Sequence, residues 1–359
     1  MSNYVEYNEK IAFHPGYYIK EIVDESGLTQ EDFAKRLDTT PKNLSIIIRG
    51  EQSLSREMAM KLSRMLGTSV EYWLNIQNKY DARIAEFESD KELTIEREIF
   101  MYIDYTYFKQ NFSLPDLSRK VNDQIKVVRE FLNIATLNIL KDRDLAVSFR
   151  SYSSEPSISN VINSNAMVQI AINKTINTEA AKFNKKKFEE AVKYALSLTT
   201  SHDEFFPLIR EKFLEAGVVF VVLPNLKSSG INGATKKVGD KIMLMVNDRR
   251  AYSDTFWFTL FHEIGHIMNG DYGLTFSNEN EGNEDNADLY AQNMLIPSGE
   301  YRCFLDNRDY SEEAIRRFAK AIKRDPGIVF GRLQNDGKIP YNNVVLSRAL
   351  RHKYKVVTS

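Results

Sequence analysis

The chain has 359 residues and a formal net charge of −1, so any attraction to nucleic acid must come from a local patch and not from the whole molecule. Hydrophobic residues make up 43% of the sequence, which is ample for packed cores in two or three domains. The one cysteine, Cys303, excludes an intramolecular disulfide, and we find no leader-like segment and no run of about 18 apolar residues. We therefore expect a cytoplasmic protein with no membrane segment.

Residues 1–80 are predicted to form an all-α domain of short helices with sharp ends. The predicted helices cover 15–26, 30–37, 41–48, 55–66 and 69–78. Thr29 and Thr40 are candidate N-caps, and Pro41 takes the favoured first helical position. A short helix, a tight turn and a second short helix over 30–48 are typical of a helix-turn-helix.

The second helix of this pair would present polar side chains to a DNA groove. The candidates are Thr40, Lys42, Asn43, Ser45 and Arg49, with Gln30 placed for a phosphate at the start of the preceding helix. Residues 35–64 carry seven basic and three acidic side chains, a local charge of +4. The alternative is a helical protein-binding or dimerisation module whose charges only face solvent.

Three segments of this domain resemble the HigA-type antitoxins, which are Xre-like helix-turn-helix regulators from bacterial toxin–antitoxin modules. They are Phe13-His14-Pro15-Gly16, the run Leu28-Thr29-Gln30-Glu31-Asp32-Phe33-Ala34, and Glu71-Tyr72-Trp73-Leu74-Asn75-Ile76-Gln77. The resemblance implies a homodimer that binds double-stranded operator DNA at a palindromic site and has a cognate toxin as its protein partner. The chain departs from the family at Asp38, where many such domains have glycine.

Residues 81–200 are predicted to be a mainly helical connector without chemistry of its own. Segments 81–100 and 115–140 are helical in pattern, and the aromatic segment 101–112 is more typical of a core or a domain interface than of a ligand site. The Ser- and Asn-rich stretch 148–165 indicates a loop or linker. Lysines at 182 and 185–187 are interpreted as a solvated helix start, with a nucleic-acid contact as the alternative.

Residues 201–359 are predicted to form an α+β domain. A helix over 205–215 is followed by strands at 218–223, 230–235 and 241–246, then by helices from 253 and from 284. Strands placed before the first of these two helices suggest a small mixed sheet over it. Gly230 and Gly233 could let an edge strand hold an extended peptide, or they could merely permit a bulge.

The helix expected from Ser253 to Gly270 carries His262-Glu263-Ile264-Gly265-His266. Ser253 is the predicted N-cap. Residues four apart lie on one helix face, so the two imidazoles can bind one zinc ion, and Glu263 beside it can take a proton from water. The alternative is a buried amphipathic helix with two histidines satisfied by its core.

A catalytic zinc site needs a third protein ligand, and we predict Glu284. Ala287 and Ala291, on the same predicted helix, are small and four apart, which permits close packing on the histidine helix. Glu279, Glu281 and Asp288 are competitors for the third position. Asp288 could instead orient a ligand from outside the metal's own shell.

This region resembles the ImmA/IrrE metallopeptidase family. The matching residues are His262-Glu-Ile-Gly-His266, Glu284-x-x-Ala287-Asp-x-Tyr-Ala291 and Leu295-Ile-Pro297. The resemblance implies Zn²⁺ bound by His262, His266 and Glu284, with Glu263 as the general base. Members with an N-terminal Xre domain act as regulators or antitoxins; some cleave a partner repressor, and others have no demonstrated proteolysis.

Helices are also predicted over 311–323 and 326–333. Phe318-Ala319, Pro326 and Val329 repeat the spacing of Phe33-Ala34, Pro41 and Leu44, although Arg332 falls where Ile47 stands in the first copy. Two interpretations are open: a helical pair packed beside the second domain, or a second DNA-contacting hairpin.

The predicted architecture is therefore multidomain: a helix-turn-helix domain at 1–80, a helical connector at 81–200 and a zincin-like metallopeptidase domain with a helical tail at 201–359. We expect a DNA-binding regulator or antitoxin whose zinc endopeptidase site cleaves a protein partner, such as a toxin or repressor, or the chain itself. One alternative is a non-enzymatic antitoxin and repressor whose metal site is structural or sensory. Another is an aminopeptidase-like housekeeping enzyme with an incidental helical domain.

Overall fold

The computed structural model describes residues 3–142, 157–249, 252–271 and 280–354, without the side chains of 280–283. The chain divides into two compact units, residues 1–95 and 96–359, and each is described by itself. The predicted domain boundaries at 80 and 200 stay predictions. No described helix is both long enough and apolar enough to cross a bilayer.

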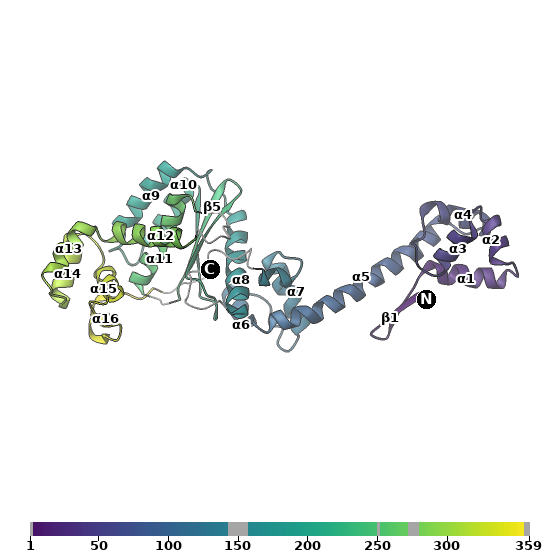
Figure 1. Cartoon of the computed structure of the whole chain (residues 1–359), viewed down its shortest axis with the longest axis horizontal. Coiled ribbons are helices and arrows are strands. Elements are labelled where there is room, and N and C mark those ends of the chain that lie inside the picture. The colour runs from purple at the N-terminus through teal and green to yellow at the C-terminus, as the bar shows by residue number, and fades with distance from the viewer. Residues whose placement is uncertain (1–2, 143–156, 250–251, 272–279, 355–359) are drawn as a thin grey trace. The chain divides into compact units, whose positions relative to one another are not determined.

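The first unit is a hairpin followed by short helices and the start of a long one (Figure 1). Its elements are β1 Tyr4–Tyr7, β2 Lys10–Phe13, α1 Pro15–Glu25, α2 Gln30–Arg36, α3 Pro41–Ile48, α4 Arg56–Leu66 and α5 Val70–Phe100. The antiparallel hairpin of β1 and β2 was not predicted. The helix expected to end near Asn78 was predicted too short, because no glycine or proline interrupts the chain before Phe100.

Two residues of the segment from Phe13 to Gly16, His14 and Gly16, have structural roles at the start of α1. His14 is buried and caps the helix, since its Nδ1 accepts a hydrogen bond from Gly16 N at 3.0 Å. A Cβ on Gly16 would stand 2.0 Å from the carbonyl oxygen of Ile47, so only glycine lets α1 approach the end of α3 this closely. The histidine and the glycine therefore fix α1 against the second helix of the helix-turn-helix.

The second unit combines helices with a small sheet. Before the sheet come α6 Tyr105–Phe112, α7 Val121–Leu132, the 3-10 helix η1 Leu137–Lys141, α8 Ile158–Ile176, α9 Lys185–Ser197 and α10 Phe205–Glu215. The strands are β3 Val218–Leu223, β4 Gly233–Val238 and β5 Lys241–Asn247. After them come α11 Ser253–Asn269, α12 Asn280–Leu295, α13 Ser298–Asp306, α14 Glu312–Ala321, α15 Pro326–Asn335 and α16 Val344–Leu350.

The sheet is mixed, as the sequence predicts, and its strand order is β3-β5-β4. β5 runs parallel to β3 and antiparallel to β4, and nearly all of its residues are buried because helices cover both faces of the sheet. Figure 1 shows α8 on one side of the strands and α11 on the other. The second strand begins at Gly233 and not at Gly230, whose N–H donates to Ser164 Oγ instead.

The prediction of a linker through residue 165 was wrong from Ile158 onward, where α8 begins and packs on the sheet. The part of this stretch at 148–156 lies outside the described residues. Buried amides of α8 bond to backbone carbonyls of other elements: Asn163 Nδ2 donates to Tyr102 O and Asn165 Nδ2 to Leu140 O, both at 2.9 Å. The Asn and Ser content that suggested a loop serves these buried contacts.

The tail repeats the turn of the first unit. Lys323, like Asp38, has a positive φ, and Arg324 N bonds to Ala319 O as Thr39 N bonds to Ala34 O. However, α15 packs on α11, and its residues Gly327, Ile328 and Phe330 are buried. These residues occupy the positions of Lys42, Asn43 and Ser45, so the tail is a packed helical pair and its second helix has no free face for DNA.

Candidate metal centre and helix-turn-helix

The histidine helix, α11, ends as predicted but begins differently. Gly270 closes it in the left-handed conformation with φ 85°. The N-cap is Tyr252, not Ser253, because Ser253 is the first helical residue and its hydroxyl donates to Asp325 Oδ1. Asp254 of the first turn is paired with Arg351 at 2.6 Å, and burial raises the pKa of this carboxyl despite the cation.

Three donor groups converge on one point between α11 and α12. The Nε2 atoms of His262 and His266 are 3.1 Å apart. Glu284 Oε2 lies 3.2 Å from His262 Nε2, and Glu284 Oε1 lies 3.5 Å from His266 Nε2. With bonds of about 2.0–2.1 Å to zinc, the edges of a tetrahedron are about 3.3 Å long. The residues present therefore match the donor set and the spacing of a zinc site.

A carboxylate holds the imidazole of His262 from the side away from the converging donors. Asp288 Oδ1 lies 2.7 Å from His262 Nδ1. Because an ionised carboxylate only accepts, this contact places the proton on Nδ1 and leaves the Nε2 lone pair for a metal ion. Asp271 Oδ2 lies 4.0 Å from His266 Nδ1, which is beyond hydrogen-bond distance. Burial and the neighbouring His262 lower the pKa of His266, which keeps it in the neutral form that a metal ion needs.

Of the three competitors for the third ligand position, Asp288 is the one whose side chain lies within the described residues. Asp288 contacts Nδ1 and not the Nε2 side, so its place is that of an orienting residue. Glu279 lies outside the described residues, as does the side chain of Glu281. Asp271 was not considered from the sequence. The sequence feature that could have indicated Asp271 is its position directly after Gly270, the residue that ends the helix. There its backbone N–H donates to His266 O at 2.8 Å, which keeps Asp271 close to that histidine.

Glu263 is buried beside the donors and faces β4. The close approach of the two helices depends on small residues: a Cβ on Gly265 would stand 3.0 Å from the Cα of Ala287. Ala287 and Ala291 are buried, as their predicted role in packing α12 on α11 requires. Gly265 therefore allows α12 to pack close enough to α11 for Glu284 to reach the two histidines.

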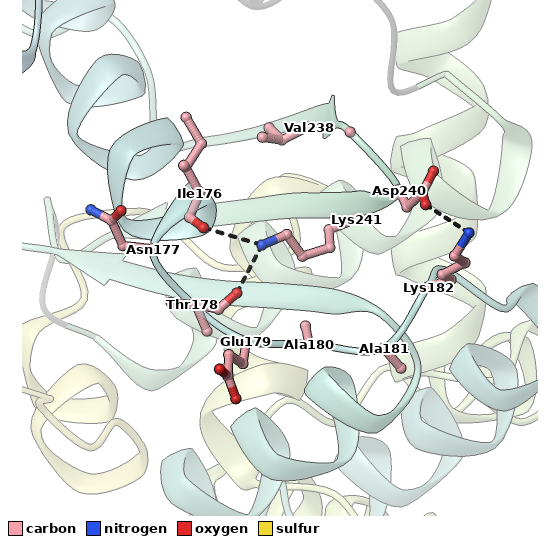
Figure 2. A pocket seen from close by; sticks show the side chains of 11 residues that line it. Ile176, Asn177, Thr178, Glu179, Ala180, Ala181, Lys182, Val238, Asp240 and Lys241 are labelled. Carbon is pink, nitrogen blue, oxygen red and sulfur yellow. Dashed lines mark hydrogen bonds and ion pairs between the residues drawn. The ribbon is translucent and has the colours of Figure 1, made fainter.

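A separate hollow of about 610 Å³ lies at the end of α8 and the turn between β4 and β5. Figure 2 shows the ammonium group of Lys241 reaching the carbonyl oxygens of Ile176 and Thr178. The same group lies 2.8 Å from Thr175 O and 2.8 Å from Thr178 O. These bonds satisfy the carbonyls at the C-terminal end of a helix. None of the predicted site residues lines this hollow, and we assign it no function.

The predicted DNA-contacting residues lie together on α2 and α3. Thr29 caps α2 through Asp32 N, and Thr40 caps α3 through Asn43 N, both at 3.1 Å. Asp38 adopts a left-handed φ of 53°, so aspartate serves the turn that glycine makes in many such domains. Gln30, Lys42 and Arg49 are exposed like Thr40, whereas Asn43 and Ser45 are half-buried.

Arg49, Ser45 and Asn43 make side-chain hydrogen bonds within the domain. Arg49 donates to both carboxylate oxygens of Glu51 at 2.8 Å and also bonds to Ser45. This pairing holds the pKa of Glu51 below its ordinary value and raises the pKa of Arg49. Asn43 bonds to Thr39 Oγ1 at 2.9 Å. The exposed face of α3 is therefore polar and ordered, with Arg49 paired to Glu51.

Two family models match separate parts of the chain. The helix-turn-helix model matches residues 19–73, and a model described as the IrrE N-terminal-like domain matches residues 219–324. The second match contains α11 with its histidine motif and α12.

Curated relatives match about a fifth of the chain. An uncharacterised helix-turn-helix transcriptional regulator of Escherichia coli, YddM, is 38% identical over 79 residues, which is 21% of this chain and 84% of the relative. Virulence-associated protein A' of Dichelobacter nodosus is 42% identical over 80 residues, which is 22% of this chain and 70% of that protein.

Two solved structures are similar to about a quarter of the chain. One is a putative antidote protein of a plasmid maintenance system from Nostoc punctiforme, with 32% identity, 25% of this chain and 93% of the other covered, and a TM-score of 0.22. The other is an addiction module antidote protein of the HigA family from Coxiella burnetii, with 29% identity, 24% and 94% covered, and a TM-score of 0.22.

Proposed function

The chain belongs to the Xre-type helix-turn-helix regulators through its N-terminal domain and carries an IrrE-like peptidase domain, and from this premise we propose that it is an operator-binding regulator of the antitoxin class with a zinc endopeptidase site. The observation that carries the peptidase half is the convergence of His262, His266 and Glu284 at tetrahedral spacing, with Glu263 buried beside them.

The residues take distinct roles in this proposal. His262, His266 and Glu284 hold Zn²⁺, and Asp288 keeps His262 in the required tautomer. When bound, zinc supplies a Lewis acid that makes water a better nucleophile and polarises a peptide carbonyl. Glu263 accepts the proton of the attacking water and later delivers it to the leaving amine. Its burial keeps this proton away from bulk solvent.

The substrate is a peptide segment in extended form. β4 is an edge strand of the sheet formed by the described residues, and its first residue, Gly233, touches the proposed general base. An extended chain added to this edge would form main-chain hydrogen bonds and pass close to Glu263. The source of that segment is a protein partner, either a cognate toxin or a repressor, or the chain itself.

The DNA half rests on the exposed polar face of α3 and the start of α2. Lys42 and Arg49 supply charge to the backbone or to base edges, while Asn43 and Ser45 face the groove and Gln30 meets a phosphate. Helix-turn-helix proteins usually bind as dimers to two half-sites one helical turn apart. We propose a homodimer on a palindromic operator upstream of the chain's own gene.

Metal content tests the peptidase half before any substrate is known. Zinc measured in purified protein should fall by one equivalent per chain in His262→Ala and stay unchanged in Glu263→Gln, because the glutamate is not a ligand. An equal zinc content in wild type and His262→Ala contradicts the proposed centre.

Glu263→Gln also decides whether the zinc site is catalytic. We expect it to abolish cleavage of the partner or of the chain while operator binding stays unchanged, since removal of a general base costs about 10²–10⁴ in rate. If toxin neutralisation and repression survive in this variant and wild type never cleaves a partner, the protein is a non-enzymatic antitoxin whose metal site is structural or sensory.

Gel shifts with the upstream DNA test the DNA half. Lys42→Ala and Arg49→Ala should weaken binding and lower the salt dependence by about one unit for each phosphate contact removed. If wild type binds the upstream DNA no more tightly than unrelated DNA, the helix-turn-helix has no operator function. That result would favour the alternative of a housekeeping aminopeptidase with an incidental helical domain.

A further inference from the structure

A second group of metal-binding side chains lies in the C-terminal unit. His202 precedes α10, Asp325 is the N-cap of α15, and His352 follows α16. Their donor atoms all lie within 4.8 Å of one another. Two of the five histidines of the chain thus meet a carboxylate at a place that the histidine helix motif does not involve.

Asp325 is the buried member of the group, with no exposed surface. Its Oδ1 accepts hydrogen bonds from Gly327 N at 2.9 Å and from Ser253 Oγ at 3.3 Å. Its Oδ2 lies 3.3 Å from His202 Nε2 but accepts no hydrogen bond within the described part of the chain. Burying a carboxylate oxygen without a donor is costly, so a cation bound to this oxygen would stabilise the folded chain. Burial also raises the pKa of Asp325.

His202 is oriented from the other side of its ring. Its Nδ1 lies 3.0 Å from Tyr354 Oη, which in turn accepts from Trp257 Nε1 at 3.3 Å. The remaining nitrogen, Nε2, therefore faces Asp325 Oδ2 at a separation that matches the edge of about 3.3 Å expected around zinc. A hydroxyl on the far nitrogen is the kind of partner that fixes a metal-binding imidazole.

His352 completes the group from an exposed position. Its ring stacks on that of His202, with centroids 3.6 Å apart and planes at 24°. Two imidazolium cations at this distance would repel, and burial together with His352 lowers the pKa of His202, so the neutral form is favoured. The nitrogen lone pairs of stacked imidazoles lie in nearly parallel planes, so they do not point at one common ion. His352 must therefore turn its ring to reach a shared ion, and its exposure leaves room for that rotation.

We propose that His202, Asp325 and His352 form a second metal site, which takes a divalent transition ion of the zinc type. Two imidazoles with one carboxylate suit such an ion, whereas magnesium and calcium prefer oxygen donors throughout. Water or a fourth side-chain donor completes the coordination. The proposal does not depend on the peptidase centre, because it uses none of its ligands.

The site would act as a clamp on the histidine helix. His352 O accepts from Ser253 N at 2.9 Å, and Arg351 pairs with Asp254, so the segment after α16 already lies across the start of α11. Ser253 precedes His262 by nine residues, about 14 Å along a helix. Metal binding at the clamp would tie this end of α11 to α15 and to the segment before α10, and so stabilise the helix that carries the catalytic residues.

Counting zinc in the full chain tests the proposal. Protein loaded with zinc and freed of excess should hold two equivalents per chain in wild type, one in His352→Ala, one in His262→Ala and none in the double variant. An equal zinc content in wild type and His352→Ala overturns the clamp. If His352→Ala loses one equivalent and His262→Ala loses none, the clamp stands and the peptidase centre fails.

Thermal unfolding gives a second readout that does not need activity. In the His262→Ala/His266→Ala background, zinc should raise the Tm by about 5 °C, because an ion bound only to the folded state stabilises it. Adding His352→Ala should abolish this rise, whereas Lys353→Ala, which changes the exposed neighbour and no metal donor, should keep it. A rise that persists undiminished with His352→Ala overturns the proposal, and the exposure of His352 makes this variant unlike one that simply fails to fold.

Discussion

Gly233 and Glu263 are in such close contact that a side chain at position 233 would collide with the glutamate. A Cβ built on Gly233 would stand 2.6 Å from Glu263 Oε1 and 2.7 Å from its Cγ. The sequence offered two explanations for this glycine, a bulge or a place for a bound peptide. The structure adds a third, which is that Gly233 makes room for the proposed general base between β4 and α11.

Gly233→Ala should destabilise the C-terminal unit by about 1–3 kcal/mol, because the added methyl group must displace a buried side chain. In Gly233→Ala/Glu263→Ala the obstructing atoms are gone, so most of this cost should disappear. Urea unfolding of the four proteins of the double-mutant cycle measures the coupling between the two sites.

The matched control is Ala234→Gly, which changes the neighbouring strand residue and should cost the same with Glu263 or with alanine at position 263. Additive effects of Gly233→Ala and Glu263→Ala would show that the contact has no energetic weight.

Asp288→Ala should weaken zinc binding at the histidine helix by about 10- to 100-fold, because His262 loses the partner that fixes its ring and tautomer. Competition with a chelator measures the affinity on the His352→Ala background, where only this centre binds. Asp285→Ala removes an exposed carboxylate from the same helix and should leave the affinity unchanged. If the two variants bind zinc equally, Asp288 has no orienting role.

Much of the fold was predictable because the relevant signals are local. Thr29 and Thr40 act as the predicted caps, and Gly270 ends the histidine helix as expected. The short helices of the first unit and the mixed sheet follow from such local patterns. The predicted placement of Glu284 needed only a helix with small residues that could pack closely, and the structure brings this side chain to both histidines.

What sequence reasoning missed depends on contacts between distant segments. The asparagines of α8 suggested a loop because their partners, carbonyls more than 20 residues away, could not be known. Likewise, Asp325 and His202 lie 123 positions apart in the numbering and meet only in the folded chain, where Asp325 Oδ2 lies 3.3 Å from His202 Nε2. The antiparallel hairpin of β1 and β2 was missed because four-residue strands carry too short a pattern.

Glu51→Gln should tighten binding to the operator by about threefold at low salt, and the gain should shrink as salt rises. The change releases Arg49 from its carboxylate partner and removes one negative charge from the face of α3. Titration by fluorescence anisotropy at several salt concentrations measures both the affinity and its salt slope. Glu25→Gln, which removes the same charge at the end of α1, is the control. Equal effects of the two changes would mean that only net charge matters and that Arg49 does not contact DNA.

Protonation of His14 at low pH should destabilise α1. Burial lowers the pKa of His14 below 6.5, although Asp81 opposes the shift, so the unfolded chain binds a proton more readily than the folded one. The stabilisation is therefore complete above about pH 6.5 and is lost as the pH falls through the lower folded pKa. Hydrogen-exchange protection of α1, corrected for intrinsic rates, should fall as the pH drops below about 6.5. His14→Asn keeps a capping side chain without a titrating group and should show no such loss. The same acid loss in both proteins would place the sensitive group elsewhere.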